Sequence, residues 1–213
     1  MDAPNSVKNI KMVTKIISVH YKTPELIYNQ YKSVRNFYPE IPYEIIDGSD
    51  DNKNYFNDLE NTDKNFVVKR FGYNIHHGPG MDYSLRNSSE DFILILDSDV
   101  SIKKELLSEM FKNFTGITTG KRIIMNKDGY EMWQKKDEDK ENFKYPYIHP
   151  YCMLINRKKY LDFKPFIKHG SPCIEFMMDV FDRGDSSDLI HFPIEEYVDL
   201  KIRGTRSKWG INL

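Results

Sequence analysis

Cysteine is scarce in this sequence, and its scarcity limits the classes of protein to which the chain can belong. Among 213 residues only Cys152 and Cys173 are cysteines, and neither lies in a Cys-x-x-Cys pair or at a Cys/His spacing typical of zinc sites. A structural zinc site and a disulfide-rich secreted scaffold are therefore not expected. A disulfide between the two is one alternative, but we favour two free thiols in a reducing compartment.

The sequence also lacks long apolar runs and an excess of charge of one sign. No stretch approaches the roughly 18 apolar residues of a membrane helix, and residues 1–14 are polar, without the apolar segment of a signal peptide. Lys plus Arg number 31 against 32 Asp plus Glu, so there is no basic excess of the kind that binds nucleic acid. We therefore expect a cytoplasmic protein with no membrane span and no nucleic-acid partner.

What the sequence does contain is an alternation of strand and helix patterns in its first half. Apolar, β-branched runs predict strands at residues 15–19, 43–47, 66–71 and 92–96. Thr23, Pro24 and Glu25 have the residue types of a helix start, and we expect this helix to reach residue 37. Such alternation predicts an α/β fold with a mainly parallel central sheet flanked by helices.

The remaining elements follow a less regular pattern. A Gly-rich loop at residues 72–80 should lead into a helix at 81–89, and an amphipathic helix is expected at 103–114. In the second half we expect strands at 118–125, 151–156 and 188–192, and a helix at 174–182 that ends at Gly184. No internal repeat or linker is evident, so a single domain is predicted.

Two carboxylates at the end of an apolar strand are the strongest functional signal. Residues 92–96 are all large and apolar, as in a strand buried on both faces, and Asp97, Ser98 and Asp99 follow directly. In an extended segment Asp97 and Asp99 would project to one side, and buried carboxylates are costly unless they are paired or bind a cation. The pattern predicts a Mn²⁺ or Mg²⁺ site able to hold a diphosphate, and a pair of exposed turn carboxylates is the plainer alternative.

Other polar segments are expected at the same edge, because open parallel sheets bind ligands beyond the carboxyl ends of their strands. The first strand ends near His20 and Tyr21. The second ends at Asp47, where a simple polar turn is one interpretation. In the functional interpretation Asp47, Asp50 or Asp51 accepts a hydrogen bond from a nucleobase or ribose.

The Gly-rich loop, which contains Asn74 and Gly78, also has two interpretations. Its Gly-Pro-Gly sequence either turns the chain only, or brings backbone N–H groups close to an anion at the start of a helix. Neither a Walker A pattern nor a GxGxxG pattern is present.

In their order along the chain, these features resemble the nucleotide-sugar glycosyltransferases of the GT-A fold, in the layout of family 2. The resemblance covers about residues 15–101: a strand followed by Thr-Pro-Glu, a strand ending in Asp-Gly-Ser, a Gly-rich loop, a helix with Arg86 and Asn87, and the Asp-x-Asp strand. The sequence also resembles the N-terminal glycosyltransferase domain of a large multidomain protein encoded by a chlorella virus. The resemblance implies one GT-A domain over residues 1–213, with a nucleotide-sugar half at about 15–101 and an acceptor half at about 102–213. A fragment of a longer protein is one interpretation of this domain.

The resemblance also implies roles for individual residues. Asp97 and Asp99 would bind the metal together with the ribose or diphosphate. Many members have an acid where this chain has Ile46, so base contacts are expected to shift to Asp50 or Asp51. The residues expected to contact the nucleotide sugar are His20, Tyr21, Asp47, Asp50, Asn74, Gly78, Asp82, Arg86 and Ser98.

The second half supplies candidates for the acceptor side. Inverting members place a catalytic carboxylate at a helix start, and Glu175 and Asp179 share one face of the helix predicted at 174–182. Two solvated helix acids are the alternative. His191 is a candidate third metal ligand or a structural histidine. Further along the chain, basic residues are either a diphosphate clamp or ordinary surface charge: Arg203, Arg206 and Lys208.

The resemblance implies transfer of a sugar from a nucleoside diphosphate sugar, with UDP favoured, to a carbohydrate or glycan hydroxyl; it leaves an inverting or retaining outcome open. One rival is a phosphohydrolase of the haloacid-dehalogenase type, with Asp97 as nucleophile and Asp99 as acid/base. Against it, that strand normally opens the domain, whereas three strands precede it here. The other rival is a non-catalytic domain that binds sugars by stacking on aromatic side chains. Its candidates are Trp133, Tyr145, Tyr147, Tyr151 and Trp209.

Overall fold

Seven strands form the central sheet, in the spatial order β3-β2-β1-β4-β7-β6-β8. The structure, a computed structural model, describes residues 14–112, 114–167 and 170–200. The strands are β1 (Thr14–His20), β2 (Tyr43–Asp47), β3 (Phe66–Arg70), β4 (Phe92–Leu96), β6 (Thr118–Met125), β7 (Tyr145–Asn156) and β8 (Leu189–His191). β3, β2, β1 and β4 are parallel, β7 runs antiparallel to both its neighbours, and β8 is parallel to β6. The mainly parallel α/β sheet predicted from the sequence is confirmed.

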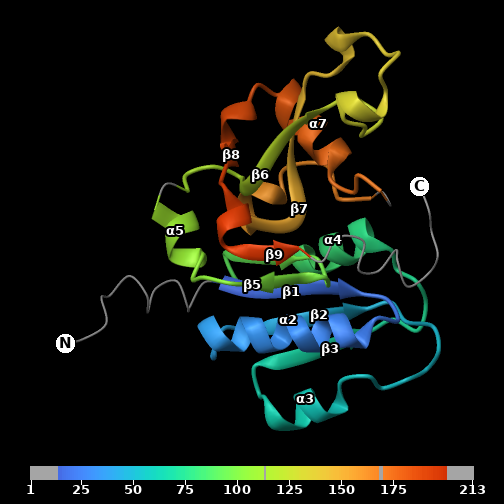
Figure 1. Ribbon diagram of the computed structural model, residues 1–213, viewed down its shortest axis with the longest axis vertical. Coiled ribbons are helices and arrows are strands. Elements are labelled where there is room, and N and C mark those ends of the chain that lie inside the picture. The colour runs from blue at the N-terminus through green and yellow to red at the C-terminus, as the bar shows by residue number, and fades with distance from the viewer. Residues whose placement is uncertain (1–13, 113, 168–169, 201–213) are drawn as a thin grey trace.

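Helices cover both faces of this sheet (Figure 1). α2 (Pro24–Phe37) packs on one face, and α4 (His77–Asn87) and α7 (Ile174–Asp182) pack on the other. Ile16 belongs to the hydrophobic cluster under α2, whereas its neighbour Ile17 belongs to the cluster under α4 and α7. Because successive strand residues point to opposite faces, a strand covered on both sides is expected to be apolar along its length, as β4 is. β1 is apolar at Ile16, Ile17 and Val19.

α4 begins at His77, four residues before the start predicted from the sequence. The Gly-Pro-Gly segment therefore forms the first helical turn instead of a loop. Pro79 is tolerated there because the first N–H groups of a helix have no intrahelical acceptor. Gly80 permits close packing on the sheet, since a Cβ at this position would lie 3.1 Å from Val19 and 3.2 Å from Ile46.

The segment after the acidic residues also differs from the prediction. In place of one helix over 103–114, the chain forms β5 (Val100–Ile102) and the short α5 (Leu107–Lys112). β5 pairs with β9 (Val198–Leu200) in a separate two-stranded antiparallel sheet. No local pattern reveals a pairing between segments so distant in sequence. Two further short helices were not predicted either: α3 (Asn57–Thr62) and α6 (Arg157–Tyr160).

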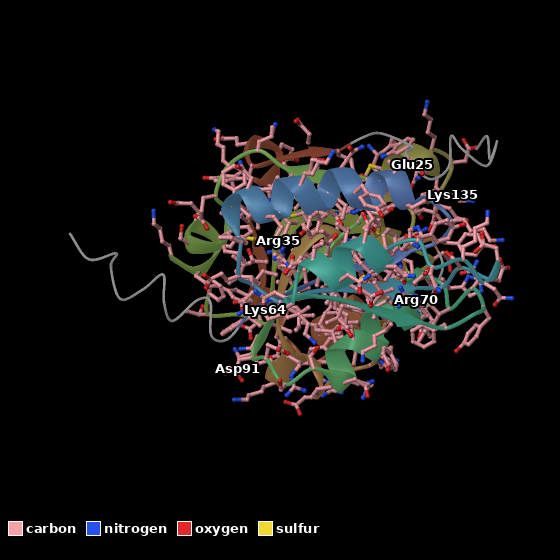
Figure 2. All side chains as sticks on the ribbon, turned by 90° about the horizontal axis from the view of Figure 1, so that it is seen from below. Glu25, Arg35, Lys64, Arg70, Asp91 and Lys135 are labelled. Carbon is pink, nitrogen blue, oxygen red and sulfur yellow. The ribbon has the colours of Figure 1, made fainter. Side chains whose placement is uncertain are left out.

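The parallel strands give the molecule two distinct ends, which we call the carboxyl rim and the amino rim. Figure 2 shows Arg70, the last residue of β3, and Glu25, in the first turn of α2, at the carboxyl rim. Arg35, near the end of α2, and Lys64, just before β3, lie at the opposite end. β1, β2 and β4 all end at the carboxyl rim, so the predicted site segments do converge there.

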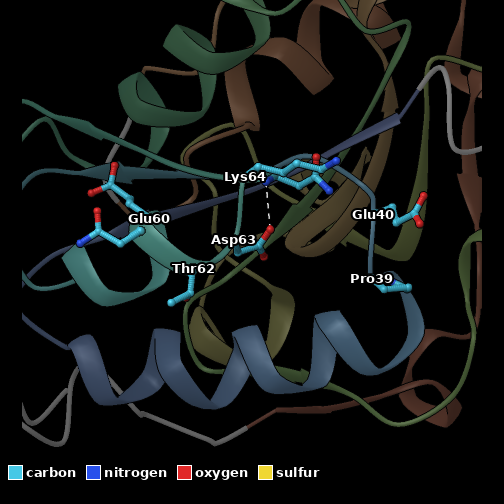
Figure 3. Close-up of a pocket in the computed structure, with 8 residues that line it drawn as sticks. Pro39, Glu40, Glu60, Thr62, Asp63 and Lys64 are labelled. Atoms are coloured by element: carbon cyan, nitrogen blue, oxygen red, sulfur yellow. Dashed lines mark hydrogen bonds between the residues drawn. The ribbon is translucent and has the colours of Figure 1, made fainter.

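A shallow depression at the amino rim is remote from those segments (Figure 3). It is formed by the turn after α2, by the end of α3 and by the segment between α3 and β3, and its lining includes Glu40, Glu60, Asp63 and Lys64. The two cysteines are buried free thiols, as expected. Within the described residues, no helix combines the length and the apolar character needed to cross a bilayer.

Candidate active site

A tight turn between β4 and β5 carries the two acidic residues. The N–H of Asp97 donates to the carbonyl of Tyr151 on β7 (2.9 Å), and the N–H of Val100 donates to the carbonyl of Asp97 (3.0 Å). Asp97, Ser98 and Asp99 therefore lie in a turn and not in the extended segment assumed from the sequence, because the strand ends at residue 96. Ser98 is buried within this turn.

The buried amide of Gln30 fixes the turn to α2. Its Nε2 donates to the carbonyl oxygens of Asp97 (2.6 Å) and Val100 (3.1 Å), the two ends of the turn. Its Oε1 accepts from the hydroxyls of Ser18 (2.6 Å) and Tyr43. With both ends of the amide satisfied, this fully buried side chain links α2 to the acidic turn.

His77 brings an imidazole to the carboxylate of Asp97. Its Nε2 lies 2.9 Å from Oδ1 of Asp97, at the distance of an ion pair. Oδ1 is otherwise enclosed and has no hydrogen-bond partner among the described residues. Burial opposes ionisation of Asp97, but the nearby His77 lowers the pKa of this carboxyl below its ordinary value. Burial opposes the charged form of His77 too, yet the attraction of Asp97, with a smaller contribution from Asp99, raises the pKa of the imidazole.

His20 and Asp47 close the corner between β1, β2 and α2. Nδ1 of His20 lies 2.9 Å from Oδ1 of Asp47, and Nε2 accepts the N–H of Thr23 (2.9 Å), so the imidazole is assigned as the neutral Nδ1–H tautomer. Burial opposes ionisation of Asp47, but hydrogen bonds from His20 and Ser49 outweigh it and lower the pKa of the carboxyl. The imidazole is fully enclosed. Direct contact between His20 and a nucleobase, as predicted from the sequence, is therefore not expected.

Thr23 occupies the N-cap position of α2, as predicted, but its side chain makes no capping hydrogen bond. Its hydroxyl oxygen is buried and without a hydrogen-bond partner among the described residues. Instead of a side-chain cap, the hydrogen bond from the backbone N–H of Thr23 to Nε2 of His20 fixes the start of the helix.

Tyr21, Asp50 and Asn74 lie more openly at the carboxyl rim. The hydroxyl of Tyr21 donates to Oδ2 of Asp50 (3.3 Å), and the ammonium of Lys22 forms an ion pair with the same carboxylate. The hydrogen bond from Lys22 lowers the pKa of Asp50. Asn74 is exposed, and its Oδ1 accepts the N–H of His76 (3.0 Å) at the start of α4. These side chains are placed where a base and ribose could reach them.

On α4, Asp82 and Arg86 are bound to each other. Nε of Arg86 lies 2.9 Å from both carboxylate oxygens of Asp82, and the hydroxyl of Tyr160 donates to Oδ1 of Asp82 (2.6 Å). Tyr160 also accepts the N–H of Phe166 (3.0 Å). Gly78, in the first turn of the same helix, is buried. The side chain of Arg86 is 43% exposed, so its guanidinium remains accessible to a ligand.

The two acidic residues of α7 have different surroundings. Asp179 forms a two-point ion pair with Arg183 (3.1 and 2.9 Å) and accepts the N–H of Lys164 (3.0 Å). Glu175 lies half-buried in the first turn of the same helix. Asp179 therefore has the environment of a structural ion pair.

His191 ends β8, where it is exposed and its Nδ1 accepts the N–H of Arg122 (3.3 Å). Within residues 14–112, 114–167 and 170–200, no group of three or more His, Cys, Asp or Glu could by itself hold a metal ion. The structure thus does not bring His191 into one ligand set with Asp97 and Asp99. The basic residues predicted to clamp a diphosphate, and Trp209, lie outside the described residues.

Sequence reasoning missed Gln30, His77 and Tyr160. His77 lies within the Gly-rich segment at residues 72–80, and its place in that segment is the available signal. Gln30 and Tyr160 reach the site only through contacts distant in sequence, to Asp97 and Asp82, and no local pattern marks them.

A known protein family matches the part of the chain that carries this site. The sequence matches the family described as Glycosyl transferase family 2 over residues 15–163, which is more than half of the chain and includes the acidic turn. The chain belongs to glycosyl transferase family 2. No curated protein matches it significantly.

Several solved structures share the fold of this family 2 domain. The mannosyltransferase PcManGT from Pyrobaculum calidifontis, solved with GDP-Man and Mn²⁺, is 11% identical with a TM-score of 0.61, over 84% of this chain and 54% of that one. TarS of S. aureus is 15% identical with a TM-score of 0.60, over 88% and 60%. Glucosyl-3-phosphoglycerate synthase from Mycobacterium tuberculosis, solved with Mn²⁺, UDP-glucose and phosphoglyceric acid, is 12% identical with a TM-score of 0.58, over 92% and 80%. The GT-A fold is confirmed, and the chain spans only 54% and 60% of the first two proteins.

The acidic turn of this family 2 domain fits a divalent cation. Asp97 offers an enclosed carboxylate oxygen without a hydrogen-bond partner among the described residues, and Asp99 offers a second carboxylate on the same turn. Hard cations such as Mg²⁺ and Mn²⁺ prefer oxygen ligands and commonly keep positions for water and phosphate. Two carboxylates at an open rim are therefore suited to a cation that also binds a diphosphate.

Proposed function

We propose that this domain is a metal-dependent glycosyltransferase that moves a sugar from a UDP-linked donor to a hydroxyl group of a carbohydrate acceptor. The observation that carries the proposal is the enclosed carboxylate oxygen of Asp97, which contacts His77 in the first turn of α4 at the carboxyl rim. This rim is where open parallel sheets bind nucleotides. Two proteins of the same fold were solved with a nucleotide sugar and Mn²⁺.

In this proposal Asp97 and Asp99 hold Mn²⁺ or Mg²⁺. The bound cation supplies positive charge where negative charge develops on the leaving diphosphate. Gln30 keeps the turn in place, so that the carboxylates need little reorganisation when the donor binds. The first turn of α4 adds N–H groups that favour an anion, and the exposed guanidinium of Arg86 can pair with a phosphate oxygen.

Tyr21 and Asp50, with Asp51 nearby, are proposed to bind the base and ribose. His20 and Asp47 lie behind them and would hold this part of the rim rigid through their own hydrogen bond. This arrangement is supported by the pairing of β1 with β2, which places the ends of the two strands side by side.

For the acceptor, we assign Glu175 the role of general base in an inverting reaction. A general base must be able to accept a proton from the attacking hydroxyl, and Asp179 is already bound by Arg183. A retaining reaction requires no base at this position.

The phosphohydrolase rival is disfavoured by the order of the strands, because β1, β2 and β3 all precede the acidic strand β4. The alternative hypothesis of a non-catalytic sugar-binding domain is weakened too, because some of its candidate stacking residues are not accessible. Tyr147 and Tyr151 are buried in the core, whereas Trp133 is 66% exposed. The free, buried thiols are in keeping with the cytoplasmic location expected from the sequence.

The test is a thermal-shift panel of UDP-, GDP- and TDP-sugars, each with and without Mn²⁺. A ligand that binds only the native state raises the melting temperature according to its affinity and concentration. We expect a shift with UDP-sugars that requires Mn²⁺ and is lost in Asp97→Asn. The matched control is Asp128→Asn, which alters an exposed carboxylate after β6. A shift that persists in Asp97→Asn, or one that does not need a metal, would contradict the proposed metal role.

Sugar transfer itself is tested by incubating the protein with UDP-sugar and Mn²⁺ and measuring release of UDP with and without added glycans. Release that is stimulated by a glycan supports the transferase. Hydrolysis of generic phosphate esters without any release of UDP would favour the phosphohydrolase instead.

A further inference from the structure

Exposed apolar side chains are concentrated between the end of β6 and the start of β7. Of the nine large hydrophobic side chains that are exposed in the described part of the chain, four lie within residues 124–133: Ile124, Tyr130, Met132 and Trp133. Trp133 is the most exposed of the nine, at 66%. Apolar side chains that are scattered singly over a surface are ordinary, whereas a concentration of them indicates a contact site.

A buried asparagine fixes the turn that carries Tyr130. Oδ1 of the fully buried Asn126 accepts the N–H groups of Asp128 (3.1 Å) and Tyr130 (2.9 Å). The backbone N–H of Asn126 donates to the carbonyl of Tyr130 (2.9 Å), and its Nδ2 donates to Glu138 (2.8 Å). The ammonium of Lys135 lies 4.5 Å from the centre of the Tyr130 ring. The aromatic side chain is therefore in place before a ligand arrives, which lowers the entropic cost of binding.

This turn packs against the start of α7, the helix that carries Glu175. The hydroxyl of Ser171 donates to the carbonyl of Gly129 (2.6 Å). Gly129 has φ of +83°, and a Cβ there would lie 2.6 Å from Ser171 and 3.8 Å from Ile174. The close approach that glycine permits places residues 126–130 beside the helix of the proposed general base.

The segment also lies beyond the carboxyl rim. Leu96, the last residue of β4, pairs with Cys152 on the antiparallel β7, so residues 145–151 of β7 continue past the end of β4. The connection from β6 to β7 is joined to this projecting part of the sheet. Figure 2 shows Lys135 at the same end of the molecule as Glu25, which lies at the carboxyl rim.

His149, on β7, relates the segment to the acidic turn. Burial lowers the pKa of its imidazole, and the carboxylates of Asp97 and Glu131 both oppose this shift through their charge. Glu131 also caps the 3-10 turn Met132–Gln134, which contains Trp133. Because charge effects weaken with distance, the acidic turn and the Trp133 turn both lie in the neighbourhood of this one imidazole.

We propose that Trp133 and Tyr130 form the acceptor subsite of this domain, in which a sugar ring of a carbohydrate stacks on their aromatic faces. The inference rests on the proposed function, because it names the surface that binds the acceptor of that reaction. A pyranose ring carries C–H groups on its faces and hydroxyl groups at its edge. The aromatic rings suit its faces, and the exposed side chains of Gln134 and Lys136 can hydrogen-bond its hydroxyls. A second copy of the chain suits this surface less, because residues 135–141 are all charged and the cores of protein interfaces are depleted of Lys, Asp and Glu.

The test compares acceptor kinetics of Trp133→Ala and the unaltered full chain. The assay contains Mn²⁺ and the UDP-sugar that gives the largest thermal shift, and its acceptors are methyl glycosides of glucose, galactose and mannose and their disaccharides. We expect KM for the acceptor to rise on the order of tenfold in Trp133→Ala, while kcat and KM for the UDP-sugar change little. Trp133→Phe keeps an aromatic ring and should restore most of the acceptor affinity.

The matched control is Val67→Ala, which removes an exposed apolar side chain (43%) from β3 at the other edge of the sheet. Thermal melting shows whether each variant is folded, and exposed Trp133 should be replaced without loss of stability. Titration of the same saccharides without donor, followed by intrinsic fluorescence, measures acceptor binding independently of turnover.

The outcomes separate this inference from the proposed function. An acceptor KM that is unchanged in both Trp133→Ala and Tyr130→Ala overturns the subsite and leaves the transferase standing. Sedimentation that shows a dimer for the unaltered chain and a monomer for Trp133→Ala also overturns it, because the surface would then join two copies. If no saccharide stimulates release of UDP from the unaltered chain, the proposed function is contradicted. Saccharide binding that still requires Trp133 would then support the subsite alone, and its absence would overturn both.

Discussion

Nε2 of Gln30 lies 2.6 Å from the main-chain carbonyl oxygen of Asp97, which joins the middle of α2 to the acidic turn. The same amide nitrogen reaches the carbonyl of Val100, so one side chain spans the turn. A fully buried amide whose polar atoms are all engaged is typical of a residue that fixes local geometry.

Replacing Gln30 with leucine should therefore harm both stability and metal binding. The substitution keeps a similar volume but leaves the carbonyls of Asp97 and Val100 and the hydroxyls of Ser18 and Tyr43 without this partner. We expect the free energy of unfolding to fall by about 3 kcal/mol and the affinity for Mn²⁺ to fall with it, as measured by urea denaturation and calorimetry. Asn36→Leu removes an exposed amide from the same helix and should change stability by less than about 0.5 kcal/mol. Equal effects of the two substitutions would refute the anchoring role of Gln30.

An ion pair at the amino rim should make stability depend on pH without affecting the site. Arg35 contacts Asp63 (2.5 Å) and also donates to the carbonyls of Tyr38, Ile41 and Asn65. Burial opposes ionisation of Asp63, but the N–H of Asn65 and the guanidinium of Arg35 lower the pKa of its carboxyl below the unfolded value. The stability gained from this charge is therefore complete above the unfolded pKa, about 4, and is lost as the pH falls through the lower folded pKa.

Asp63→Asn should accordingly lower the free energy of unfolding by about 2 kcal/mol at pH 7, and the difference from the unaltered protein should shrink below pH 4. Urea denaturation at pH 7, 5 and 3 measures this change, and binding of UDP-sugar should be unaffected because the depression in Figure 3 is remote from the carboxyl rim. A difference that stays constant across this pH range would argue against a charge effect.

The two acidic residues of α7 should separate activity from stability. If Glu175 is the general base, Glu175→Gln should reduce turnover by roughly 10²- to 10⁴-fold with little change in melting temperature. Asp179→Asn weakens the ion pair with Arg183 and should lower stability by about 1 kcal/mol while retaining more activity. Steady-state turnover and thermal melting of both variants provide the comparison. Full activity in Glu175→Gln would exclude the base role and favour a retaining reaction.

The strands and the acidic turn could be predicted because their signals are local. An apolar run that ends in charged residues identifies β4, and parallel order places the ends of β1, β2 and β4 on one rim. The start of α4 was predicted too late, because Gly-Pro-Gly usually marks a loop. Pro79 needs no backbone hydrogen bond because it lies in the first turn of the helix, and Gly80 has no side chain to hinder its close contact with Val19. Neither circumstance is evident from the sequence.

The supporting contacts could not be predicted, because they join residues that are far apart in the chain. Gln30 is a polar residue in an amphipathic helix, and nothing nearby indicates that it is buried against residue 97. Glu175 and Asp179 show the opposite case. Their spacing of four residues predicts a shared helical face, yet the ion pair between Asp179 and Arg183 changes the role that Asp179 can have.

α2 is attached to the carboxyl rim at two points. At its start, the N–H of Thr23 is bound to His20, beside Asp47, and seven residues later Gln30 holds the acidic turn. These points lie roughly 10 Å apart along the helix axis, and the helix between them is rigid. A ligand that reduces motion near His20 and Asp47 would therefore also reduce motion in the acidic turn at Asp97. The two halves of a nucleotide sugar would then bind cooperatively, although their contacts lie on different strands.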